Sequence, residues 1–310
     1  MEQYTPMKSL KLKPLFCLLL LAVLAQPMLA ERASLKLSFI TNSISGNDVN
    51  TWIESYNTLW QDVRSSQGGD LQGQFTPIDF GSTLEFELRI PLYKGFAINF
   101  AGSYFSSSTE GRVDFIKADG TQTASQFISN SVSAYPMKIG FSYAFPIPAL
   151  PRLKILAGLG REIIFVKYKS SDNFENAFTQ GVAERYWYEK ESEYNSEKLG
   201  WYLNFGAEFD LLEFLAIVAE GEKVWGVAVD GFKGPQSYKG FILGDPDKDT
   251  FDINGKASLY FYELQTRLNN YYATLAGQFD RPEGDEFREV RQGLLDFNTF
   301  SLKIGIRFKF

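Results

Sequence analysis

Hydrophobic and polar residues alternate with a period of two along much of this chain, most clearly at its end. One set of alternate positions there is entirely hydrophobic: Phe300, Leu302, Ile304, Ile306, Phe308 and Phe310. The positions between them are polar or small: Ser301, Lys303, Gly305, Arg307 and Lys309. Because successive side chains of a strand point to opposite faces, the pattern predicts a strand with one apolar and one polar face.

Six other segments alternate in the same way and are also predicted as strands. Their hydrophobic faces comprise Leu35, Leu37 and Phe39; Leu84, Phe86, Leu88 and Ile90; Phe96, Ile98, Phe100 and Tyr104; Tyr135, Met137, Ile139, Phe141, Tyr143 and Phe145; Leu153, Ile155, Ala157 and Leu159; and Trp201, Leu203, Phe205, Phe209 and Leu211. A further strand begins near Phe214 and runs toward Val227, and the sequence leaves open which of its two faces points inward. The count is about eight strands. The alternative is ten, with Ser258 to Thr266 and Tyr271 to Phe279 as an added hairpin.

Short and long connections alternate between these strands. Tight turns are predicted at 91–95, 146–152 and 210–213, where proline, glycine or acidic residues gather. Long polar segments occupy 42–76, 106–130, 170–196 and 230–294, and we expect them to be four long loops. Short turns at one end and long loops at the other are typical of bacterial outer-membrane barrels.

The N-terminal thirty residues have the pattern of a cleavable signal peptide. Lys8, Lys11 and Lys13 precede an apolar run of about a dozen residues, which is shorter than the roughly 20 residues that a transmembrane helix needs. Ala30 is the expected last residue before cleavage, with Ala25 as the alternative site; an uncleaved membrane anchor is the competing interpretation. Residues 31–310 would then form a single domain exported through the Sec pathway.

The composition excludes several kinds of chemistry. The chain has no histidine, and its one cysteine, Cys17, lies in the predicted signal peptide. Catalysis by Ser-His or Cys-His pairs, imidazole or thiolate metal sites and disulfides are therefore excluded from the mature chain. Removing residues 1–30 takes away three lysines and one glutamate, so the net charge falls from -6 to -8. That charge argues against nucleic acid as a partner, and we expect neither an enzyme nor a cofactor.

The final residues, Ile304-Gly305-Ile306-Arg307-Phe308-Lys309-Phe310, resemble the C-terminal strand of bacterial outer-membrane barrel proteins. Together with the signal pattern and the repeated strands, the chain resembles the small eight-stranded OmpA/OmpX-type barrels. The resemblance implies an all-β transmembrane up-and-down barrel in the outer membrane, in contact with lipid and lipopolysaccharide. It also implies a barrel-closing strand, recognised by the barrel assembly machinery, with Leu302, Ile304, Ile306, Phe308 and Phe310 on its apolar face.

The polar faces of the predicted strands carry a cluster of charges. It comprises Glu85, Glu87, Arg89, Lys138, Lys154, Glu208, Lys303 and Arg307. Because the interior of an eight-stranded barrel is just wide enough for its own side chains, we expect these charges to fill the lumen. The function would then be structural, or an interaction with an unidentified surface partner through the loops. The alternative is a narrow porin-like channel for small or hydrophobic solutes.

Two motifs lie in the long segments. Thr51 and Glu54 match a capping box, and apolar residues at helical spacing follow them, so a short amphipathic helix is predicted in the first loop. Its apolar stripe would pack on the barrel rim or neighbouring loops, enter the membrane interface or bind a partner. Asp245, Asp247, Asp249 and Asp252 lack the glycine and glutamate of a calcium loop, so they are interpreted as solvated surface and no metal site is predicted.

Overall fold

The computed structural model describes residues 32–42, 44, 46–178, 185–241, 250–266 and 269–310. The predicted signal peptide (1–30) and residues 245–249 of the acidic motif lie outside this part of the chain. The protein is all-β, with antiparallel sheets and one described helix, α2 (Asn47–Gln67). This confirms that the chain is all-β and antiparallel, and it confirms the helix in the first long segment.

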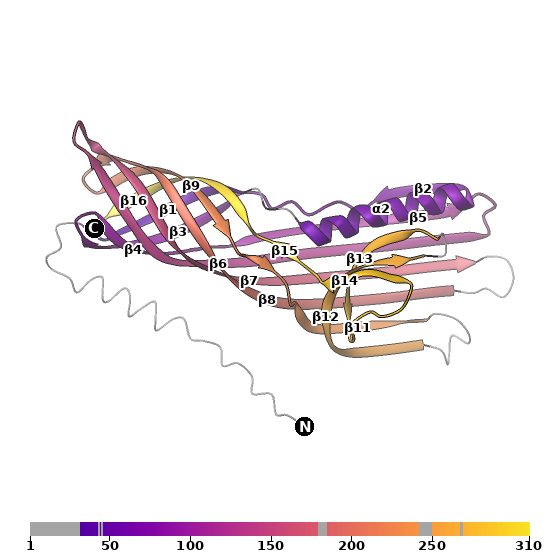
Figure 1. The fold of residues 1–310 in the computed structure, drawn as a ribbon. Coiled ribbons are helices and arrows are strands. Elements are labelled where there is room, and N and C mark those ends of the chain that lie inside the picture. Colours follow the sequence, from indigo (N-terminus) through magenta and orange to yellow (C-terminus); the bar gives the residue numbers. More distant parts are fainter. Residues whose placement is uncertain (1–31, 43, 45, 179–184, 242–249, 267–268) are drawn as a thin grey trace, which may run out of the picture.

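Eight strands pair in an order that returns to its starting strand, and we call them the eight-strand cycle. In order of pairing they are β1 (Ser34–Asn42), β3 (Thr83–Tyr93), β4 (Phe96–Ser103), β6 (Gln122–Ile147), β7 (Leu150–Phe178), β8 (Arg185–Leu212), β9 (Leu215–Trp225) and β16 (Thr299–Lys309). β16 pairs again with β1, and Leu37 lies opposite Ile306. Figure 1 shows these strands crossing obliquely around one end of the molecule.

The three predicted tight turns lie together at the end of the cycle that also holds the C-terminus (Figure 1). The turn between β3 and β4 consists of Lys94 and Gly95, which have φ values of 39° and 87°. A Cβ on Gly95 would lie 2.7 Å from the backbone oxygen of Ala144. Gly95 therefore provides both the left-handed conformation and the close approach to β6.

The described residues form sixteen strands, twice the number counted from the sequence. The other eight are β2 (Gly69–Gln74), β5 (Phe105–Lys117), β10 (Ala228–Val229), β11 (Lys233–Phe241), β12 (Thr250–Gln265), β13 (Tyr271–Gln278), β14 (Phe287–Gln292) and β15 (Leu295–Asp296). β5 pairs with β6, and β11 pairs with β8, so β6, β7 and β8 continue from the cycle into a second, curved region of sheet. We call this second region the extension (Figure 1).

The prediction that these four segments are long loops is therefore wrong. Residues 106–130 and 170–196 lie mainly in β5, β6, β7 and β8, and 42–76 and 230–294 contain α2 and further strands. Residues 258–266 and 271–279 do form a hairpin, but it belongs to the extension and not to the cycle. The strands of the extension were missed because serine, asparagine and glutamine occupy many of their positions. Hydrophobic residues therefore alternate only weakly along these strands, although their backbones pair in register.

Helix α2 starts earlier than the capping box predicted. It begins at Asn47 after an N-cap at Gly46, so Thr51 lies inside the helix and the predicted N-cap is wrong. Asp48 in its first turn accepts the backbone N–H of Leu294 at 2.7 Å and binds Arg291. This contact with a distant segment, which no local pattern reveals, accompanies the earlier start of the helix.

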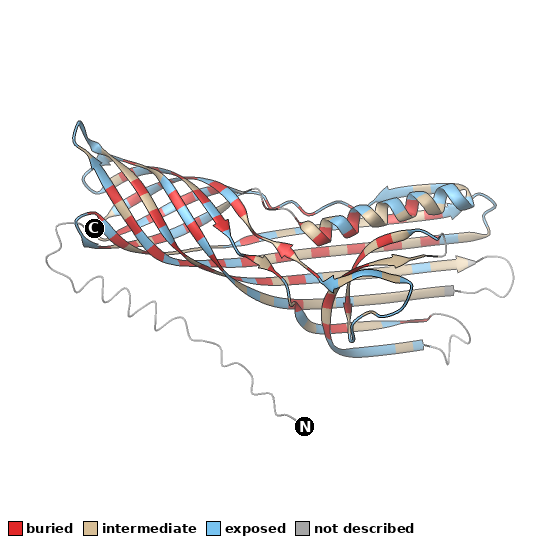
Figure 2. Cartoon of the chain, viewed as in Figure 1, coloured by how far each residue is buried: buried red, intermediate tan, exposed pale blue. Residues whose placement is uncertain are grey.

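The helix covers the space between the two edges of the extension. It contacts β2 and β5 on one side and β13 and β15 on the other. Trp52, Ile53 and Trp60 are buried in a core shared with the strands. The apolar stripe thus packs on neighbouring elements, the first of the three roles considered from the sequence. Figure 2 shows buried and exposed residues alternating along the strands of the cycle.

Candidate functional site

The inner face of the eight-strand cycle holds fourteen charged side chains, which we call the charge network. Seven are cationic: Lys36, Arg89, Lys138, Lys154, Lys303, Arg307 and Lys309. Seven are carboxylates: Glu85, Glu87, Glu162, Glu208, Asp210, Glu220 and Glu222. All eight residues of the cluster proposed from the sequence lie in this network, in alternation with residues that point outward.

Two lysines and two glutamates form the centre of the charge network. Nζ of Lys138 lies 2.8 Å from Oε2 of Glu85 and 2.5 Å from Oε1 of Glu222. Nζ of Lys303 lies 2.7 Å from Oε1 of Glu85 and 2.7 Å from Oε2 of Glu222. The four side chains come from β3, β6, β9 and β16, so they connect strands across the interior.

A second group lies nearer the tight turns. Arg307 pairs with Glu87 at 2.8 Å and with Glu208, while Lys36 pairs with Glu87 at 2.9 Å and with Glu220. All five side chains are buried. A buried charge has a large desolvation cost unless it is paired, and here every one has at least one partner of opposite sign.

The rim of the network at the turn end is looser. Lys154 lies 3.2 Å from Asp210 and 3.8 Å from Glu208, and Arg89 lies 3.9 Å from Glu208. Lys309 lies 2.7 Å from Glu208 and also pairs with Asp210. These distances place Lys154 and Arg89, two members of the predicted cluster, at the edge of the charge network.

Six members of the network were missed from the sequence: Lys36, Glu162, Asp210, Glu220, Glu222 and Lys309. Lys36 alternates with Leu35 and Leu37 and was recognisable from that pattern. Glu220 and Glu222 were not, because both faces of β9 mix apolar and polar residues and its inward phase was undetermined. Their register with β16 and β8 decides that they point inward.

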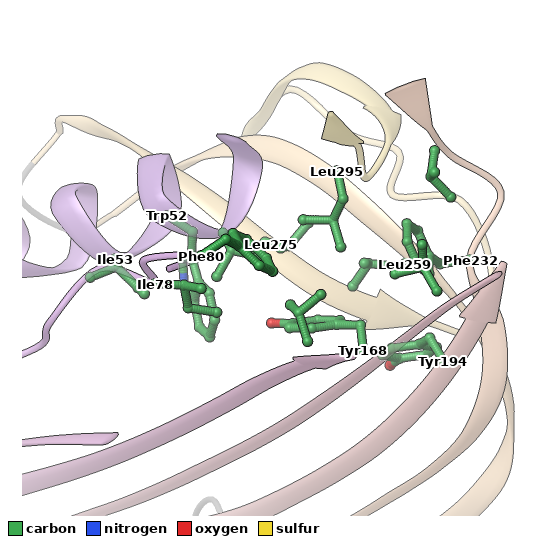
Figure 3. Packing of buried hydrophobic residues seen from close by; sticks show 14 of the residues in the cluster. Trp52, Ile53, Ile78, Phe80, Tyr168, Tyr194, Phe232, Leu259, Leu275 and Leu295 are labelled. Carbon is green, nitrogen blue, oxygen red and sulfur yellow. The ribbon is translucent and has the colours of Figure 1, made fainter. Parts of the chain in front are cut away.

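The interior is nearly filled around the centre of the network, whereas a pocket of about 600 Å³ opens at the turn end beside Arg89, Lys154 and Asp210. A cavity of about 20 Å³ adjoins Lys138, Glu162 and Glu222, which is the size of one water molecule. Beyond it, Ile44, Phe105 and Val224 begin a hydrophobic core that continues under α2 into the extension. Figure 3 shows this core further along, where Trp52 and Ile53 of the helix lie among Leu275, Leu295 and Tyr168 from strands.

A second candidate site, the distal pocket, lies in the extension between α2 and the inner faces of β5, β6, β7 and β8. Its volume is about 280 Å³. It is lined by Tyr56, Leu59, Trp60, Val63, Gln67, Phe115, Gln122, Ala124, Gln126, Phe174, Asn176, Tyr186 and Tyr188. Sequence analysis did not identify it, because the residues that face the predicted helix come from segments interpreted as loops.

Hydrogen bonds fix the floor of the distal pocket. Nε1 of Trp60 donates to Oε1 of Gln126 at 2.9 Å, and Nε2 of Gln126 donates to Oδ1 of Asp172 at 2.9 Å. The hydroxyl of Tyr188 donates to Oδ2 of Asp172 at 3.2 Å. One chain of hydrogen bonds thus joins α2, β6, β7 and β8 and sets the orientation of the Gln126 amide.

Burial changes the ionisation of the groups beneath the distal pocket. Burial raises the pKa of Asp172, against the opposing effect of its hydrogen bonds and of Lys190. Burial also lowers the pKa of Lys190 to about 8, and the carboxylate of Asp172 limits this shift. Asp172 and Lys190 are opposite one another on β7 and β8, and Nζ of Lys190 donates to the backbone oxygen of Gly277 at 3.0 Å.

In the described part of the chain, no group of three or more acidic side chains is arranged to hold a metal ion. No described helix is both long and apolar enough to cross a membrane. In comparisons with known proteins, no family model and no curated protein matches this chain.

Proposed function

We propose that this protein is an integral outer-membrane barrel. Its eight-strand cycle spans the membrane, its charge network fills the lumen, and its extension interacts with partners at the cell surface. The observation that carries the proposal is the distribution of side chains in the cycle, which is hydrophobic outside and charged inside. A soluble protein has the reverse distribution, because buried charges are costly and large exposed apolar patches are rare.

The exposed hydrophobic surface is concentrated on the cycle. Among large hydrophobic side chains exposed in the described residues, Ile116, Ile253 and Phe279 alone lie away from the cycle strands and the residues adjoining them. Ile304 is 67 % exposed and Phe205 is 64 % exposed, although both lie in the middle of long strands. On the same strands, Lys303 and Glu208 point inward and are almost completely buried.

The dimensions of this surface fit a bilayer. From Phe300 to Phe310 are ten residue steps, which at ~3.3 Å each and a strand tilt of ~40° give a height of roughly 25 Å. The apolar band of outer-membrane barrels is about 25 Å tall. Aromatic side chains lie toward both ends, with Tyr104 against Tyr135 near one and Phe96 against Tyr143 near the other. Tyrosine and phenylalanine in such positions are typical of membrane interfaces.

In this proposal residues 1–30 direct export, and β16 closes the barrel against β1. The backbone of β16 is paired with β1 and β9 along its length, so neither strand edge would be exposed to lipid. The outward residues of β16 would contact lipid and lipopolysaccharide, and the barrel assembly machinery would recognise this strand.

The position of the extension supports the role proposed for it. β7 continues for thirteen residues after Phe165, which corresponds to about 40 Å of strand beyond the apolar band. The tight turns and the C-terminus lie at the other end (Figure 1). With the turns in the periplasm, the extension projects from the cell and presents a folded surface rather than separate loops.

A matched pair of substitutions tests the membrane assignment. Ile304→Lys places a charge in the middle of the apolar band, and Ile253→Lys places one on an exposed isoleucine of the extension. We expect Ile304→Lys to lower the free energy of unfolding in lipid vesicles by about 2–4 kcal/mol. Ile253→Lys should change it by less than about 0.5 kcal/mol.

The opposite result would overturn the membrane assignment. A mature protein that stays monomeric and folded without detergent, and that gains solubility from Ile304→Lys, would be a soluble β protein. The two substitutions are made in the full mature chain, and urea titration in vesicles gives both free energies.

A further inference from the structure

The distal pocket differs from the rest of the molecule in the chemistry of its lining. Six of its thirteen described lining residues are aromatic: Tyr56, Trp60, Phe115, Phe174, Tyr186 and Tyr188. Four are amides: Gln67, Gln122, Gln126 and Asn176. None of the thirteen is charged, although charged residues make up 22 % of the chain. A ligand for this pocket must therefore offer both apolar surface and neutral hydrogen-bonding groups.

We propose that the distal pocket binds a neutral saccharide. A pyranose ring has a face of C–H groups that packs on aromatic rings, and an edge of hydroxyl groups that both donate and accept hydrogen bonds. Aromatic rings provide flat apolar contact area at a small entropic cost. Amide side chains are the neutral groups that donate and accept at the same time, as hydroxyl groups require.

The aromatic rings are arranged as a continuous surface. The ring centroids of Trp60 and Phe174 are 6.3 Å apart, and those of Phe174 and Tyr188 are 5.6 Å apart with an angle of 23° between their planes. Tyr186 contacts Phe174 at 5.3 Å. The rings come from α2, β7 and β8, so their packing against one another holds the wall of the pocket in place without a ligand.

The amides of the pocket are also held in defined positions. Nε2 of Gln122 donates to Oδ1 of Asn176 at 3.0 Å, across the pair β6 and β7. This bond uses one donor and one acceptor, and an amide side chain has two of each. Gln126 is oriented by Trp60 and Asp172, as described above. A site ordered before binding loses less entropy when the ligand arrives.

Two charged groups beneath the pocket, Asp172 and Lys190, are engaged with neighbouring groups of the protein. Asp172 accepts hydrogen bonds from Gln126 and Tyr188, and Lys190 donates to Gly277. A carboxylate or ammonium group on a ligand would lose its hydration in the pocket, and none of the lining residues carries an opposite charge to compensate for that loss. Charge complementarity therefore favours a neutral sugar over its acidic or amino derivatives.

The volume of the pocket limits the size of the ligand. About 280 Å³ is near the lower end of the range of small-molecule pockets, which begins at ~300 Å³. This suits one or two sugar rings. The sugar is either a free mono- or disaccharide or the terminal unit of a longer glycan, and the two share the chemistry argued above. The inference rests on the proposed function only for its location outside the cell.

Calorimetry on the full mature protein in detergent micelles tests the proposal. The probes are glucose, galactose, mannose, N-acetylglucosamine, maltose and lactose, with glucuronate and glucosamine as charged counterparts. We expect at least one neutral sugar to bind, and the charged counterparts of the same ring to bind at least tenfold more weakly. Repeating the titration with that sugar immobilised on beads distinguishes a free ligand, which loses binding, from a terminal glycan unit, which keeps it.

Substitutions in the pocket and matched controls complete the test. Gln122→Leu and Asn176→Leu remove the paired amides, and Tyr186→Leu removes a ring; each should weaken binding at least tenfold. Gln74→Leu on β2 and Tyr93→Leu at the tight turn change exposed residues outside the lining and should leave binding unchanged. The amide on β6, Gln122, and the amide on β7, Asn176, are replaced in separate variants. If one variant misfolds, the other variants still test the proposal.

Three results would overturn the saccharide proposal. The first is that none of the neutral sugars binds to the unmodified protein. The second is that the control substitutions weaken binding as much as the pocket substitutions. The third is that the charged counterparts bind more tightly than the neutral sugars. Because folding into vesicles is measured separately with Ile304→Lys, a failure of sugar binding leaves the membrane assignment intact, and the reverse also holds.

Discussion

Nζ of Lys303 lies 2.7 and 2.9 Å from the two carboxylate oxygens of Glu85, a residue 218 positions earlier in the chain. Both side chains are almost completely buried. Lys303→Met leaves Glu85 and Glu222 with Lys138 as their remaining close cation. We expect it to lower the free energy of unfolding in lipid vesicles by about 3–5 kcal/mol, because it leaves buried carboxylates undercompensated. Urea titration measures the loss.

An exposed ion pair provides the control for Lys303. Lys239 lies 2.6 Å from Glu189 in the extension, with both side chains about half exposed. Lys239→Met should cost about 0–1 kcal/mol. Equal effects of the two substitutions would mean that the charge network contributes no more than a surface pair. Restoration of stability in Lys303→Met by a second change, Glu85→Gln, would show that the uncompensated carboxylate causes the loss.

The filled interior predicts that the barrel is closed to ions. In planar bilayers the refolded mature protein should insert without discrete conductance steps, because the cavity inside the network holds about one water molecule. Replacing Glu85, Lys138, Glu222 and Lys303 with serine removes four long side chains and leaves the net charge unchanged. This variant should show small, reproducible openings.

Two ion pairs of the extension give the matched control for conductance: Lys167 with Glu193 and Lys239 with Glu189. Serine at these four positions should leave the barrel silent. Discrete openings of the unmodified protein would instead favour the porin-like channel considered from the sequence, and would show that the charge network moves.

The start of α2 is held by a bidentate ion pair. Nη1 and Nη2 of Arg291 lie 2.5 and 2.7 Å from the carboxylate oxygens of Asp48, which also accepts the backbone N–H of Leu294. Asp48→Asn keeps the shape of the side chain but removes its charge. We expect a loss of roughly 1–3 kcal/mol in local stability, measured as faster amide hydrogen exchange in α2.

Asp70→Asn is the control for Asp48. Asp70 is exposed on β2 and accepts a hydrogen bond from Gln72 at 2.9 Å. It should leave exchange in α2 unchanged. If Asp48→Asn also had no effect, the packing of Trp52 and Trp60 alone would be holding the helix on the sheet.

The partly buried Lys190 predicts a pH dependence of stability. Its pKa of about 8 is below the ordinary value of 10.5, so between these values the unfolded chain keeps a proton that the folded chain has lost. The contribution of Lys190 to the free energy of unfolding therefore rises with pH across this window. Comparison of the unmodified protein with Lys190→Met isolates the effect, since the variant lacks that rise.

Carbon-13 NMR of the lysine side chains checks the titration directly. The resonance that disappears in Lys190→Met should titrate with a midpoint near pH 8. Lys169→Met, a change to an exposed lysine on the outer face of β7, should leave that resonance in place. A midpoint for Lys190 near 10.5 would show that its amine is hydrated and would remove the predicted pH dependence.

The amino-acid sequence by itself determined the two faces of each strand in the cycle. The alternation that places Lys303 and Arg307 on one face and Ile304 and Ile306 on the other is a property of a single strand, because it depends only on the period of the extended backbone. All-β structure, tight turns at one end and the eight charges proposed for the interior follow from that local rule.

The tertiary structure decided which strands meet and where they end. Glu220 and Glu222 enter the charge network because β9 pairs with β16 and β8 in one register, and a shift of one residue would turn them outward. The distal pocket exists because α2 lies over β7 and β8, whose residues 170–176 and 186–194 show no clear alternation of hydrophobic and polar positions. Register and packing depend on contacts between residues far apart in the chain, so a local pattern does not contain them.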